Sequence, residues 1–112
     1  MRLASLIGLL FLALESCEYY NTDVILKSNC ESVSYKKEIS PIIQSHCANS
    51  GCHVAGFQQG NFTCYDSLKM KIDNGAFKLR VFDTKSMPPL SKLNEIEFQK
   101  IKCWFDSGAR NN

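Results

Sequence analysis

Apolar residues recur at helical spacing in the first stretch of the chain that follows the polar region near Cys30. This stretch covers residues 34–46, and its apolar positions are Tyr35, Ile39, Ile42 and Ile43. Their three- and four-residue intervals predict one face of an amphipathic helix. Pro41 lies inside the pattern, so either the helix begins earlier and bends there, or Ser40 caps a new helix with Pro41 at its first position.

A second helix is predicted between residues 63 and 75. Thr63 fits the N-cap position, with Asp66 three residues later, and Gly75 fits the end of the helix. Leu68, Met70 and Ile72 in this segment are expected to contribute to the core. The preceding residues 54–62 contain two glycines and an asparagine and are predicted to form a loop.

The last predicted helix has the clearest boundaries. Asn94 fits its N-cap with Glu97 at the third helical position, and Gly108 fits its end. Its expected apolar face comprises Ile96, Phe98, Ile101, Trp104 and Phe105. Residues 77–81 are ambiguous, and residues 87–90 must be extended because two prolines exclude a helix there. The chain is therefore predicted to be all-α, with three to five short helices joined by glycine and proline loops.

The amino terminus has the pattern of an export signal. Arg2 precedes an apolar run over residues 3–14, which is too short for a permanent span of about 20 residues. Residues 14–17, Leu-Glu-Ser-Cys, resemble a bacterial lipobox, which implies a signal peptide over residues 1–16 and a lipid on Cys17. Soluble secretion and a membrane anchor are the alternatives. We expect residues 17–32 to form a polar tether and residues 33–112 a single domain in an oxidising compartment, the periplasm or the outer membrane.

The size and composition of the chain limit the possible functions. The chain has 112 residues, and the domain that remains without the signal segment has a small core. Such domains are commonly stabilised by disulfides, a metal or a large cofactor. The six cysteines agree with this expectation. The net charge is only +2, and the longest basic cluster is Lys36-Lys37, so a nucleic-acid binder is not expected.

The most informative motif runs from Cys47 to His53. It reads Cys-Ala-Asn-Ser-Gly-Cys-His, and a cysteine pair followed directly by histidine is typical of c-type haem attachment. The two thiols can form thioethers to the haem vinyl groups, and the histidine can bind the iron. The usual spacing has two residues between the cysteines, whereas this chain has four. The additional residues, including Gly51, must bulge outward if both thiols are to reach the haem.

Three segments together resemble the bacterial cytochrome c domain family, in the order found in that family. They are residues 39–53, with Ile-Ser-Pro-Ile-Ile before the motif, the Met87-Pro88-Pro89 loop, and the terminal segment 101–109. The resemblance covers roughly residues 33–110. It implies a small cytochrome c fold around one covalent haem c, with His53 and Met87 as the axial ligands.

The resemblance also bears on the remaining cysteines. In the cytochrome arrangement the first and last helices cross, which makes a Cys30–Cys103 disulfide the first choice. Cys64–Cys103 is the second choice, and one thiol is left over in either case. A Cys47–Cys52 disulfide and a zinc site that includes these cysteines and a histidine are alternatives to haem attachment.

Two other residues compete for the ligand roles. His46 abuts Cys47 and is expected to be a surface histidine, unable to reach the opposite haem face. Met70 is expected in the core, which leaves Met87 on its proline-stiffened loop as the sixth ligand.

The expected function is that of a single-electron carrier, not an enzyme. Iron with two protein ligands has no open position, and no catalytic triad, carboxylate pair or phosphate loop is visible in the sequence. We expect a monomer that meets redox partner proteins and contacts the membrane through its lipid. A basic rim for an acidic partner, as opposed to ordinary solvated charges, would consist of Lys36, Lys37, Lys78, Arg80, Lys85 and Lys92. The alternatives are a haem-free, disulfide-stabilised exported lipoprotein that acts as an interaction module, and a haem sensor or peroxidase-like protein in which Met87 is not bound.

Overall fold

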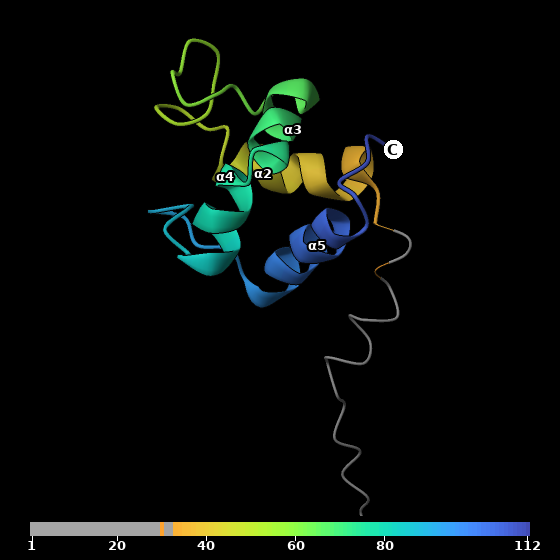
Figure 1. Ribbon diagram of the computed structural model, residues 1–112. Coiled ribbons are helices and arrows are strands. Elements are labelled where there is room, and N and C mark those ends of the chain that lie inside the picture. The colour runs from red at the N-terminus through yellow and green to blue at the C-terminus, as the bar shows by residue number, and fades with distance from the viewer. Residues whose placement is uncertain (1–29, 31–32) are drawn as a thin grey trace, which may run out of the picture.

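The computed structural model describes Cys30 and residues 33–112, and Figure 1 shows their arrangement. The described residues form four α-helices and two π-helical turns, without a β-strand. The all-α prediction is therefore confirmed. The predicted signal peptide over residues 1–16, the lipid site Cys17 and nearly all of the tether lie outside the described residues.

The first helical segment begins earlier than Pro41. The π-helical turn η2 (Tyr35–Ile39) runs directly into α2 (Ser40–His46), and the Ser34 hydroxyl accepts a hydrogen bond from the Lys37 N–H at the start of η2. Ser40 has helical backbone angles, so it is not an N-cap. Pro41 lies in the first turn of α2, where its missing N–H costs least.

Helix α3 (Tyr65–Asp73) begins later than the sequence predicts. Its N-cap residue is Cys64, which makes no side-chain capping bond, and the Thr63 hydroxyl donates to the Asn61 side chain at 2.6 Å. The predicted Thr63 cap is therefore wrong. Gly75 follows the helix with a φ of +80°, a conformation that favours glycine, so this predicted end is confirmed.

The chain between α3 and α5 turns twice before it reaches the last helix. Helix α4 (Ala76–Lys78) continues into the π-helical turn η3 (Leu79–Asp83), which buries Phe77 and Val81. Residues 77–81, which the sequence pattern left ambiguous, are thus helical. An irregular loop over residues 84–94 follows, and the cis peptide bond between Met87 and Pro88 lies within it.

Helix α5 (Glu95–Asp106) begins as predicted. The Asn94 side chain accepts from the Glu97 N–H at 2.9 Å, and a Glu97 carboxylate oxygen accepts from the Asn94 N–H at 3.0 Å. Ile101 and Trp104 are fully buried, whereas Ile96 is 58% exposed. The prediction that Ile96 belongs to the apolar face is wrong because the first turn of α5 extends past the core.

The first helical segment packs against the last. The Tyr35 and Trp104 rings are stacked with their centroids 5.4 Å apart, and a Cys30–Cys103 disulfide spans a Cα–Cα distance of 4.8 Å beside them. This is the pairing that the resemblance placed first. The residues after α5 return to η2, where Asn112 accepts hydrogen bonds from the Tyr35 and Lys36 N–H groups (Figure 1).

Within residues 33–112, no helix has both the length and the apolar character that crossing a bilayer requires.

Candidate functional site

A cavity of about 450 Å³ opens between the loop after α2, the α4–η3 segment and the loop before α5. Its volume lies within the range of roughly 300–1,000 Å³ typical of small-molecule and cofactor sites. The sequence-predicted residues Cys47, Cys52, His53 and Met87 all line it. The other lining residues are His46, Phe57, Gln59, Phe62, Lys71, Ala76, Phe77, Arg80, Val81, Pro88 and Pro89.

The segment between the two cysteines forms a closed turn. The Cys52 N–H donates to the Asn49 carbonyl at 3.0 Å, and Gly51 between them has a φ of +81°. The His53 N–H then donates to the Cys47 carbonyl at 2.9 Å. The four intervening residues are therefore absorbed in a turn that leaves the motif's two ends in direct contact.

His53 is held in one orientation by its neighbours. Its ring stacks on Phe62 with the centroids 3.9 Å apart and meets the edge of Phe57 at 5.1 Å. The Nδ1 atom lies 3.1 Å from the Gly60 carbonyl oxygen, so Nδ1–H is the donor. This fixes the tautomer in which Nε2 carries the lone pair, as in metal-binding histidines.

Electrostatics also favour the neutral form of His53. Burial lowers the pKa of His53 below its ordinary value, and the positive charge of Lys71 lowers it further, although the hydrogen bond to Gly60 acts in the opposite direction. A neutral imidazole is the form that binds a metal ion.

Both motif cysteines are free thiols in the structure, so the Cys47–Cys52 disulfide does not form here. Burial, followed by the nearby Cys52, raises the pKa of the Cys47 thiol to about 11. A thiol with so high a pKa is not activated as a nucleophile at neutral pH. In the described part of the chain no three His, Cys, Asp or Glu side chains converge on a metal position, which leaves the zinc alternative without its ligands.

The two candidate methionines differ in position. Met87 lines the cavity, is 39% exposed, and its N–H donates to the Arg80 carbonyl at 3.1 Å. Met70 is 63% exposed on α3 and does not line the cavity. The prediction that Met70 belongs to the core is therefore wrong, yet the placement of both residues favours Met87 as the ligand.

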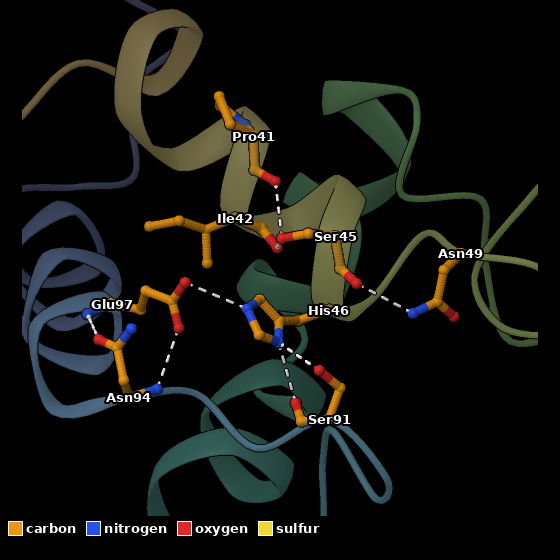
Figure 2. Close-up of polar contacts among 8 residues, drawn as sticks. All are labelled: Pro41, Ile42, Ser45, His46, Asn49, Ser91, Asn94 and Glu97. Carbon is orange, nitrogen blue, oxygen red and sulfur yellow. Dashed lines mark hydrogen bonds and ion pairs between the residues drawn. The ribbon is translucent and has the colours of Figure 1, made fainter.

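His46 is not the surface histidine that the sequence suggested. Its side chain is only 14% exposed and lines the cavity, and Figure 2 shows it between Ser91 and Glu97. The Nδ1 atom lies 3.0 Å from the Ser91 carbonyl oxygen and 2.8 Å from the Ser91 hydroxyl, and Nε2 lies 3.2 Å from a Glu97 carboxylate oxygen. With both ring nitrogens engaged, His46 is not available as a metal ligand.

The cationic residues of the predicted rim have different local surroundings. Arg80 lines the cavity, and Lys78 pairs with Asp83 at 2.8 Å. Lys85 and Lys92 line a second cavity of about 260 Å³, and Met87 lines both cavities. The basic rim stays a prediction.

The sequence analysis missed several cavity residues. Lys71 is one, although its position one helical turn after the buried Leu68 could have indicated it. Phe57 and Phe62, which hold the His53 ring, are others, and they belong to a loop without hydrophobic periodicity.

Comparison of the chain with models of protein families, with curated proteins and with solved structures gave no match. A function is therefore assigned from the residues and their geometry alone.

Proposed function

We propose that this chain is a monohaem c-type cytochrome that carries single electrons. Cys47 and Cys52 would hold haem c through thioethers, and His53 and Met87 would be its axial ligands. The observation that carries the proposal is the single cavity lined by all four residues, although Met87 follows His53 by 34 positions in the chain.

The residues present fit a covalently attached haem. Both thiols are reduced, which thioether formation requires, and the turn at Gly51 lets the four-residue spacing bring Cys47 and His53 together. The Nε2 atom of His53 has its lone pair available. The cavity walls carry aromatic and apolar side chains, which suit the macrocycle, and Lys71 and Arg80 could face its carboxylates.

Haem c would supply a reversible one-electron Fe(III)/Fe(II) couple. The contribution of the chain is to hold and tune that group. Stacking on Phe62 and the hydrogen bond to Gly60 orient His53, and a thioether from Met87 raises the reduction potential relative to a second histidine. Two protein ligands leave no iron position open, so the proposed role is electron transfer, with no substrate chemistry.

The proposal extends to the location of the protein. A signal peptide over residues 1–16 and a lipid on Cys17 would place the domain in the periplasm or at the outer membrane, as a monomer that exchanges electrons with redox partner proteins. The Cys30–Cys103 disulfide is compatible with such an oxidising compartment. Mass spectrometry of the native amino terminus tests the lipid, since an unmodified peptide that begins elsewhere would remove this part of the proposal.

The decisive experiment is an extraction of the purified native protein with acid and organic solvent. We expect a Soret band before extraction and haem that stays with the protein afterwards. Cys47→Ala with Cys52→Ala should abolish covalent retention, whereas Cys64→Ala, which removes an exposed thiol outside the cavity, should retain it.

Two outcomes would contradict the proposal. A protein without a Soret band would favour the haem-free, disulfide-stabilised lipoprotein, in which the Cys30–Cys103 bridge serves an interaction domain. Haem that leaves with the solvent would exclude the c-type attachment.

A further inference from the structure

His46 connects three parts of the molecule that are far apart in the sequence. It is the last residue of α2 and directly precedes Cys47. Its Nδ1 atom reaches Ser91, 45 residues later, and its Nε2 atom reaches Glu97, 51 residues later (Figure 2). One side chain therefore joins the attachment segment, the Met87 loop and the start of α5.

The partner on α5 is itself fixed. One carboxylate oxygen of Glu97 accepts the Asn94 N–H in the capping box, and the other faces the Nε2 atom of His46. Glu97 thus holds the imidazole from an element that is anchored in the core through Ile101 and Trp104.

The loop that carries Met87 has few other attachments. Residues 84–87 and 89–92 are exposed, and Pro88 is buried. Among the described residues, Thr84 and Met87 hold the first half of the loop to η3, because Thr84 bonds to the Leu79 carbonyl and the Met87 N–H donates to the Arg80 carbonyl. The two contacts of Ser91 with His46 are the hydrogen bonds that tie residues 88–93 to another element. Loss of the contacts between Ser91 and His46 would leave residues 88–93 without a hydrogen bond to another element.

The chemistry of Ser91 allows the contact to survive a change in the protonation of His46. An imidazolium can donate to the Ser91 carbonyl through Nδ1 and to Glu97 through Nε2. A neutral imidazole with its proton on Nε2 still donates to Glu97 and accepts at Nδ1 from the Ser91 hydroxyl. Each form therefore keeps one bond to the loop and one to α5.

From this geometry we propose that His46 is a positioning residue, which tethers the Met87 loop over the cavity and so keeps the distal thioether in place. The role for the thioether rests on the proposed function, whereas the tether does not. His46 acts through Ser91, and it does not touch the iron.

A matched pair of substitutions separates the two bonds of His46. The side-chain nitrogen of asparagine can occupy the place of Nδ1, and that of the longer glutamine the place of Nε2. His46→Asn should keep the bond to Ser91 and lose the bond to Glu97, whereas His46→Gln should do the reverse. Asparagine removes more volume than glutamine, so a packing effect alone would raise cleavage more in His46→Asn than in His46→Gln, which is the opposite of the order that the tether predicts.

Limited trypsin digestion of the full native protein measures the tether, with or without haem. Lys85 and Lys92 lie in the loop and are exposed, so cleavage after them reports loop opening. His46→Gln should be cleaved there about three- to tenfold faster than the unmodified protein, as expected for loss of a hydrogen bond. His46→Asn should be cleaved at the original rate, and so should the control Ser86→Ala, whose hydroxyl bonds to Thr84 within the described residues.

A second readout connects the tether to the ligand. In the haem-loaded protein, His46→Gln should weaken the sulfur-to-iron absorption band at the red end of the spectrum, and His46→Asn should retain it. Faster cleavage in both His46 variants, or in neither, would overturn the tether. If the protein contains no haem, the proposed function is wrong, and the digestion of the haem-free protein still tests the tether between His46 and Ser91.

Discussion

The backbone N–H of His53 donates to the carbonyl oxygen of Cys47 at 2.9 Å, across the whole attachment motif. This bond closes the ring of residues that contains the four-residue spacer between the cysteines. Gly51 makes the closure possible, because its φ of +81° is strained for any residue with a Cβ atom. The expanded spacing thus ends in a compact turn, with both thiols in the lining of the cavity.

Gly51→Ala tests this turn, with Gly56→Ala as its matched control. Both glycines have similar φ values, +81° and +86°, and a Cβ at either one would meet no atom within 4 Å. Each substitution should therefore cost about 1–2 kcal/mol of unfolding free energy through backbone strain. Only Gly51→Ala should also lower the fraction of chains with both thioethers, measured by intact mass and haemochrome spectra. An equal loss in Gly56→Ala would show that the turn has no special role.

The distal ligand can be tested with two exposed methionines. Met87→Ala should remove the sulfur-to-iron band and let carbon monoxide or cyanide bind readily, because an axial position opens. Met70→Ala should change neither, since Met70 lies outside the cavity. Met87→His should keep both axial positions filled but lower the reduction potential, because nitrogen donors favour ferric iron. If carbon monoxide or cyanide binds readily to the Met70→Ala variant alone, Met70 and not Met87 is the distal ligand.

Features that depend on near neighbours in the sequence were predictable. The capping box of Asn94 and Glu97 has both partners within three residues, and Gly75 needs only its own backbone conformation. The same reasoning failed at Thr63, because α3 begins one residue later than a Thr63 cap would require, and Cys64 is its N-cap. The residue pattern alone does not fix the first residue of a helix whose N-cap makes no side-chain bond.

The candidate site likewise has a part that the sequence predicted and a part that it did not. Cys47, Cys52 and His53 belong to one contiguous motif, and the two prolines after Met87 marked its loop. The contacts of His46 were not predictable, because Ser91 and Glu97 reach it only through the tertiary fold. Met70 was expected in the core as a methionine within a helix, yet α3 turns it toward solvent, because it lies two residues from the buried Leu68 and so on the opposite side of the helix.

Loss of the Cys30–Cys103 disulfide should destabilise the domain strongly. The bridge joins residues 73 positions apart, and the chain-entropy relation gives about 4 kcal/mol for a loop of that length. Cys30→Ala with Cys103→Ala should therefore lower the urea midpoint markedly, whereas Cys64→Ala, at an exposed free thiol, should leave it nearly unchanged. If the double variant unfolds at the original midpoint, the disulfide does not contribute to the stability of the fold.

Glu38 joins the first helical segment to the last, and its carboxylate should make the domain sensitive to acid. One oxygen accepts the Ser34 N–H and the other pairs with Lys100, both at 3.0 Å. The Ser34 bond and then Lys100 lower the pKa of Glu38 below its ordinary value.

Since the folded pKa is the depressed one, the contribution of Glu38 to stability is complete above the unfolded pKa and is lost as the pH falls through the folded pKa. Unfolding free energies from urea titrations between about pH 5 and pH 3 should therefore fall less steeply in Glu38→Gln than in the original protein. Lys100→Gln should retain part of the original slope, because the Ser34 bond, the largest single cause of the lowered pKa, remains. Should Lys100→Gln flatten the slope as fully as Glu38→Gln does, the ion pair with Lys100 would be the source of the acid sensitivity, and the bond from the Ser34 N–H would contribute nothing to it.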